Sequence, residues 1–266
     1  FSHIMTWVPI SKTKHRDKAF SRDRNYLFAK SLTLVPVCLE ELSRSVTHMP
    51  LVFYQNDHAT DIGAVLGVEE GRNLFVRDDG SWPIQFRPPL ALRCHPFWAV
   101  DLENGESTIV YREDSDLIVD RREGDPLFNI DGSDTEVLKN IAKFTLSYKR
   151  DRDRTRAACS LLVEFDLLMP LNAKFPKDDG TVIRLDNVYG VDRAKLNDLE
   201  EKKFIKLRES NSFEMIYAHL FSLNSFYVLT GIMNARLTRQ KKMESDLRGL
   251  GLEIFADKEQ KMDFYF

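Results

Sequence analysis

The sequence has 266 residues, of which 43% are hydrophobic and 30% are charged, and its formal net charge is −3. This length and composition predict one large folded domain with a sizeable core rather than a disordered chain. The slight acidic excess argues against nucleic-acid binding, and the continuous apolar runs are much shorter than the roughly 20 residues that span a bilayer.

The three cysteines, Cys38, Cys94 and Cys159, are odd in number and lack a CxxC spacing. They therefore predict neither a disulfide framework nor a zinc site, and we expect a protein of the reducing cytoplasm. No signal peptide or metal site is recognised. Residues 1–5 (FSHIM) are interpreted as a cloning remnant and are left out of the fold reasoning.

The first half of the chain is predicted to be largely antiparallel sheet. A strand over 32–39 is followed by a short helix over 40–48, and a buried strand over 51–55 begins after Pro50. Gly-containing turns at 70–71, 78–80 and 104–105 divide the next segment, because Gly tolerates positive φ. Further strands are expected over 64–68, 73–76, 82–86, 98–102 and 108–111.

A long central helix is predicted next. Ser133 and Glu136 fit a capping box, and the apolar residues that follow recur at spacings of three and four. The helix is expected to run through the charged stretch 149–156, towards Leu168. That stretch is interpreted as a solvated helix face with internal ion pairs, with contact to phosphates or a membrane surface as the alternative.

The second half adds a hairpin and more helices. The hairpin is predicted from 173–175 and 181–185 around an Asp-Asp-Gly turn, and Asp192 is expected to cap a helix. One or two buried helices are expected over 213–237. The predicted fold class is therefore α+β, with a single domain over residues 6–237 and a C-terminal tail over 238–266.

Several blocks of residues, taken in order, point to one family. They include Leu51-Val52-Phe53 after a proline, Asn73-Leu74-Phe75-Val76 with Trp82, and Arg93-Cys94-His95-Pro96-Phe97. Later blocks are Leu127-Phe128 with Asp131-Gly132, and Ile216 to Leu220. From about residue 14 to about residue 237 this order resembles the SapC family of bacterial proteins. One departure is His95, where the family usually has Tyr.

The resemblance implies a bacterial protein of about this length, linked by its family name to surface-layer proteins and their secretion. It implies no reaction, and it transfers no catalytic residue or cofactor to this chain. An accessory role in envelope or surface-layer biology is the function it favours.

The main candidate site is the segment from Arg93 to Phe97. Arg93 offers donors for a carboxylate or phosphate, His95 can carry a proton near neutral pH, and Trp82, Phe97 and Trp98 are expected to wall an apolar pocket. The alternative is a packed corner in which Arg93 pairs with an Asp or a backbone carbonyl.

Two further residues are candidates. Asp131 either presents a carboxylate at a helix N-terminus or forms an ordinary turn and cap. His219 shares a helix face with Ser222, which suggests either a nucleophilic pair or a satisfied core histidine.

The favoured hypothesis is a non-catalytic binding protein that holds a peptide or small ligand in an aromatic-lined cleft. The alternatives are an enzyme whose site is assembled from Arg93, His95, Asp131 and His219, and a structural surface protein. A protein or peptide partner is expected, and self-association is left open. No cofactor is assigned.

Overall fold

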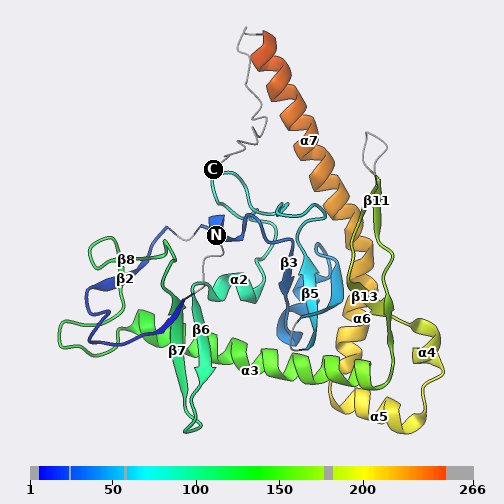
Figure 1. Cartoon of the computed structure of the whole chain (residues 1–266), viewed down its shortest axis with the longest axis horizontal. Coiled ribbons are helices and arrows are strands. Elements are labelled where there is room, and N and C mark those ends of the chain that lie inside the picture. The colour runs from blue at the N-terminus through cyan, green and yellow to red at the C-terminus, as the bar shows by residue number, and fades with distance from the viewer. Residues whose placement is uncertain (1–5, 24, 57–58, 177–181, 250–266) are drawn as a thin grey trace, which may run out of the picture.

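The computed structural model describes residues 6–249 except for 24, 57–58 and 177–181. Within that part of the chain it is an α+β protein with antiparallel strand pairings, which confirms the predicted fold class (Figure 1). The strands are β1 (Trp7–Pro9), β2 (Lys18–Ser21), β3 (Leu34–Pro36), β4 (Leu51–Gln55), β5 (Thr60–Val65), β6 (Phe97–Asp101), β7 (Ser107–Arg112), β8 (Ile118–Asp120), β9 (Gly124–Pro126), β10 (Leu168–Pro170), β11 (Lys174–Pro176), β12 (Val182–Arg184) and β13 (Val188–Val191). The α-helices are α1 (Leu42–Ser45), α2 (Leu90–Cys94), α3 (Glu136–Glu164), α4 (Arg193–Asn197), α5 (Glu201–Glu209), α6 (Ser212–Ser222) and α7 (Phe226–Gly249). The short 3-10 helices are η1 (Leu27–Ala29), η2 (Leu39–Glu41) and η3 (Leu223–Ser225).

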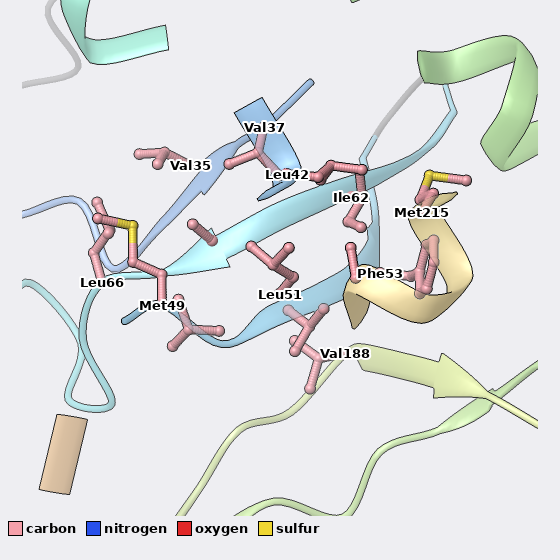
Figure 2. Close-up of a cluster of buried hydrophobic side chains, with 14 of the residues drawn as sticks. Val35, Val37, Leu42, Met49, Leu51, Phe53, Ile62, Leu66, Val188 and Met215 are labelled. Atoms are coloured by element: carbon pink, nitrogen blue, oxygen red, sulfur yellow. The ribbon is translucent and has the colours of Figure 1, made fainter. Parts of the chain in front are cut away.

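A five-stranded sheet of order β10-β13-β4-β5-β3 lies in the main hydrophobic core. Strand β4 begins after Pro50, as predicted, and pairs with β5 so that Phe53 lies opposite Ile62. Both side chains are fully buried, as is Met215 of α6 beside them (Figure 2). Burial of a side chain of this size contributes about 1.5–3 kcal/mol, so this cluster holds the sheet against the helices.

Helix α3 packs against two sheets, the five-stranded sheet that contains β5 and the three-stranded sheet that contains β6. Its N-cap is Thr135, whose Oγ1 accepts a hydrogen bond from the Leu138 backbone N–H at 3.3 Å. The capping box predicted at Ser133 is wrong, because the Ser133 hydroxyl donates to Asp131 instead. The helix continues through the charged stretch as predicted and packs against both β6 and β5 (Figure 1).

The charged stretch of α3 is partly buried. Asp151 and Arg152 lie inside the protein, and Arg152 donates to Asp61 of β5. The interpretation of this stretch as a solvated face is therefore wrong at these two positions. The helix packs that side on the sheet, and the ion pair compensates for part of the desolvation.

A smaller hydrophobic cluster lies around the N-terminal half of α3. It contains Phe20, Phe97, Tyr111 and Leu138. The first three belong to two three-stranded sheets, β8-β2-β9 and β1-β7-β6. Strands β6 and β7 are joined at the predicted Asn104-Gly105 turn, where Gly105 has a positive φ of 81°.

Residues 66–89 form a loop that contains no strand, so the strands predicted over 73–76 and 82–86 are wrong, and the strand predicted over 64–68 ends at Val65. Asn73 is buried at the centre of the loop. Its side-chain oxygen accepts hydrogen bonds from the N–H groups of Phe75 and Val76, and its amide donates to the Ala29 carbonyl. Asn73 therefore satisfies part of the loop's backbone without a neighbouring strand, and Phe75 packs on Trp82 and Phe86.

The C-terminal part agrees with the predicted elements. Strands β11 and β12 form the expected hairpin, although its Asp-Asp-Gly turn lies outside the described residues. Asp192 caps α4 by accepting from the Ala194 and Lys195 N–H groups. The apolar stretch over 213–237 falls on two helices, α6 and α7, and α7 continues beyond residue 237. The predicted burial of these helices is only partly right, because Tyr217, Phe221 and Tyr227 are exposed.

The stretch Ser212–Met243 is long and apolar enough to cross a membrane, judged by length and composition alone. However, Met215, Ile216 and His219 within it are buried in the protein. A core helix passes the same test, so the absence of a membrane-spanning segment stays a prediction.

Candidate functional site

A cavity of about 400 Å³ lies between α2 and the N-terminal half of α3. The aromatic side chains that line it are Phe20, Tyr26, Phe28, Phe97 and Phe144. These residues belong to different hydrophobic clusters, so the cavity lies where the clusters meet. Its volume falls in the range of about 300–1,000 Å³ that is typical of small-molecule sites.

Arg93 supplies the positive charge of this cavity. It projects from α2, and its guanidinium lies over the Phe144 ring at 5.0 Å from the centroid. Among the described residues it forms no ion pair, so the predicted alternative of an Asp partner is not seen there. Burial, and then the nearby charge of Arg87, lower the pKa of Arg93. The cavity thus contains a partly desolvated cation that has donors to offer.

His95 is held as a neutral ring. It stacks on Phe28 with 3.7 Å between the ring centroids, and its Nε2 lies 3.3 Å from the Ser115 hydroxyl. Burial, with a smaller effect from Arg112, lowers the pKa of His95 to about 4. At neutral pH the imidazole can therefore form a hydrogen bond with a ligand but carries no charge.

The hydroxyl and thiol groups of the lining are poorly suited to nucleophilic attack. Burial raises the pKa of Cys94 to about 12, so the reactive thiolate is scarce at neutral pH. The Thr145 hydroxyl donates to the Ile141 carbonyl of its own helix at 2.8 Å. Neither the Cys94 thiol nor the Thr145 hydroxyl is therefore arranged as a nucleophile.

Three of the predicted site residues, Arg93, His95 and Phe97, line the cavity together. Trp82 does not line it, but it contacts the lining residue Tyr26 with ring centroids 5.6 Å apart. Trp98 packs against Tyr148 instead. Adjacent residues of a strand point to opposite faces, so β6 cannot direct both Phe97 and Trp98 into one cavity.

Asp131 and His219 lie outside the cavity lining. Asp131 is exposed in the loop before α3 and accepts from the backbone and hydroxyl of Ser133, which lower its pKa. His219 is 1% exposed, with Nδ1 2.7 Å from the Leu51 carbonyl and Nε2 accepting from the Val191 N–H. These are the turn and the satisfied core histidine of the sequence-based alternatives. The four residues of the enzyme hypothesis therefore do not converge on this cavity.

Sequence reasoning missed most of the lining. Phe20, Tyr26 and Phe28 come from the N-terminal segment, for which no local pattern indicates a site. On α3, the sequence marks Ile141 and Phe144 only as part of an apolar helix face. The helical spacing of Val137, Ile141 and Phe144 is the available signal, but it is the same signal that a packed core produces.

The fold and the cavity define an α+β protein with an aromatic-lined, half-open cavity. The chain matches the family model described as SapC over residues 10–229, and it belongs to the SapC family. All cavity-lining residues fall inside the matched range. No curated protein and no solved structure matches the chain.

Proposed function

We propose that this protein is a non-catalytic binding protein that holds a small ligand or a peptide segment in the aromatic-lined cavity. The observation that carries the proposal is the position of Arg93. A half-buried cation without an ion-pair partner among the described residues borders an apolar space of about 400 Å³. A ligand with a flat or aliphatic body and a hydrogen-bond acceptor suits that combination.

The cellular role we propose is accessory, in envelope or surface-layer biology, and it is exercised from the cytoplasm. The family name supports the first part. The buried free cysteines support the second, because reduced thiols are usual in that compartment.

Native mass spectrometry of gently purified protein tests the binding proposal. We expect a stoichiometric extra mass, which Arg93→Ala reduces and Val137→Trp abolishes by filling the cavity. Arg208→Ala is the matched control, because Arg208 is exposed on α5 and does not line the cavity. A bare chain that also fails to bind members of a small-molecule library would overturn the proposal, provided that circular dichroism shows each variant to be folded.

A protein-interaction role is the second candidate, and an exposed aromatic stripe favours it. Phe204, Phe213, Tyr217 and Phe221 form a chain of ring contacts along α5 and α6, with neighbouring centroids 4.7, 6.2 and 6.2 Å apart. Phe221 is 67% exposed. Exposed apolar patches of this kind mark interaction surfaces.

We assign this stripe to a second copy of the chain. The same two helices carry exposed charges of both signs, including Lys202, Glu209 and Glu214, and such charges can pair with themselves across a two-fold axis. Sedimentation velocity should show a dimer that Phe221→Ser converts to monomer. Val182→Ser should leave the dimer intact, because Val182 is an exposed apolar residue of β12 outside the stripe. A monomer at all concentrations would exclude the assignment.

A further inference from the structure

A second, smaller cavity adjoins the first. Its volume is about 150 Å³, and Arg93 and Phe144 line both cavities. The two cavities therefore share one residue of α2 and one residue of α3 in their walls. Arg44 of α1 and Arg87, from the loop before α2, add two more guanidinium groups to the second cavity.

The three arginines bring a concentration of positive charge to this place. Within the described part of the chain, Arg44, Arg87 and Arg93 form no ion pair and their guanidinium groups make no hydrogen bond. Elsewhere on the protein, arginines such as Arg112 and Arg152 do pair with a carboxylate. Other described arginines, such as Arg150 and Arg208, also lack an ion pair among the described residues, but Arg44, Arg87 and Arg93 line one cavity together, with Arg44 and Arg87 exposed and Arg93 half-buried. Guanidinium groups suit phosphate and carboxylate oxygens.

Two carboxyl groups also border the small cavity, and the Glu41 carboxyl attracts Arg93 electrostatically without forming an ion pair with it among the described residues. Glu41 is buried, and its two oxygens accept hydrogen bonds from the backbone N–H groups of Cys38, at 3.1 Å, and Leu90, at 2.7 Å. Burial raises the pKa of Glu41 to about 7, so its charge is partial at neutral pH. Glu40 is exposed and lies 4.0 Å from Arg154 of α3.

The two cavities differ in the chemistry of their lining residues. The larger one has five aromatic walls, and the smaller one has three cationic side chains. At the boundary, the Arg93 guanidinium lies over the Phe144 ring, so the apolar and the cationic surfaces are in direct contact. A molecule that extends past Arg93 meets apolar walls at one end and guanidinium groups at the other.

We propose that the two cavities together bind one anionic amphiphile, with its apolar body in the larger cavity and a phosphate or carboxylate headgroup between Arg44, Arg87 and Arg93. This inference rests on the proposed function, because it names the class of ligand that the larger cavity accepts. The headgroup chemistry is shared by lipids, acyl carboxylates and free phosphate, so the test has to separate the headgroup from the tail.

Isothermal titration calorimetry of the full chain with three probes makes that separation. The probes are octyl phosphate, octanol, which has the same tail without the charge, and inorganic phosphate, which has the charge without the tail. We expect octyl phosphate to bind at least about tenfold more tightly than either of the other two, as the loss of a charge-assisted hydrogen bond would predict.

Variants show which cavity binds the headgroup and which binds the tail. Arg87→Ala should weaken octyl phosphate binding about tenfold and leave octanol binding unchanged, since Arg87 borders only the smaller cavity. Arg208→Ala should change neither. Val137→Trp should remove binding of both tailed probes, because Val137 lines only the larger cavity.

The outcomes distinguish the two proposals. If octanol binds as tightly as octyl phosphate and Arg87→Ala has no effect, the headgroup site is excluded while the binding cavity stands. If inorganic phosphate binds as tightly as octyl phosphate, the site takes free anions and the amphiphile is excluded. If no tailed probe binds, the amphiphile is excluded, and the mass-spectrometry result alone then decides the binding function.

Discussion

Asp61 of β5 and Arg152 of α3 form an ion pair inside the protein, with 2.9 Å between Oδ2 and Nη2. The Asp61 side chain is 0% exposed and that of Arg152 is 8% exposed. Asn56 also donates to the same carboxylate. This pair ties the long helix to the five-stranded sheet across 91 positions of sequence.

Asp61→Asn should destabilise the protein by about 3–5 kcal/mol, because it leaves the Arg152 charge buried without its partner. Urea unfolding followed by circular dichroism measures the change. Arg156→Ala is the control. Arg156 also contacts Asp61 but is 40% exposed, so its loss should cost about 1 kcal/mol or less. If Asp61→Asn lowers the free energy of unfolding by less than Arg156→Ala does, the ion pair does not hold the helix on the sheet.

His95 should make the folded state sensitive to acid. Its folded pKa of about 4 lies below the ordinary value of 6.5, so the unfolded state takes up protons more readily between these values. Its contribution to stability is full above pH 6.5 and is lost as the pH falls towards 4. Allowing for solvent screening, we expect about 1–2 kcal/mol.

The variant His95→Phe keeps a ring against Phe28 and removes the titrating group. Unfolding free energies of both proteins are measured at several pH values between 4 and 7, and the value for the wild type should decrease relative to that of the variant as the pH falls. Two parallel curves would show that His95 does not titrate in this range.

Glu41 should have the opposite dependence. Burial raises its folded pKa from 4.5 to about 7, so the folded state holds the proton more tightly than the unfolded state. Its contribution is full below pH 4.5 and is lost as the pH rises towards 7, by up to roughly 3 kcal/mol. Glu41→Gln should be less stable than the wild type at low pH, because an amide cannot accept both backbone N–H groups, and the difference should shrink by pH 7. A difference independent of pH would contradict the raised pKa.

Gly67 and Gly231 give a matched test of packing. A Cβ at Gly67 would lie 2.0 Å from the Arg72 carbonyl oxygen, whereas nothing lies within 4 Å of one at Gly231 on α7. Gly67→Ala should therefore destabilise by about 1–3 kcal/mol, and Gly231→Ala should stabilise by about 0.5–1 kcal/mol through helix propensity. Thermal melts measure both changes. Equal shifts of the melting temperature for the two variants would contradict the close approach of Gly67 to the Arg72 carbonyl.

Local patterns predicted the elements whose stability is local. The strand over 51–55 has the predicted bounds, and the Asp192 cap is where its side chain can reach two free N–H groups. The prediction failed at 73–76, where a short apolar run between turn residues resembled a strand, but the Asn73 side chain accepts hydrogen bonds from the backbone of a loop. Thr135 rather than Ser133 caps α3, because Asp131 already engages the Ser133 hydroxyl.

The candidate site was only partly predictable. Arg93, His95 and Phe97 are neighbours in sequence, and their residue types by themselves indicate a site. Trp98 belongs to the same run, but strand geometry turns it away to Tyr148. The role of His219 could not be predicted from its helix alone, because its two hydrogen-bond partners, Leu51 and Val191, lie on different strands.

Residue order alone established the α+β class, the central helix and the family, because turn chemistry, helical periodicity and motif order are properties of short segments. The cavity was decided by tertiary packing. Its walls come from residues between Phe20 and Thr145, which belong to separate hydrophobic clusters and meet only after the chain has folded. The space left where those clusters meet depends on the shapes of all the side chains together, and no short segment encodes it.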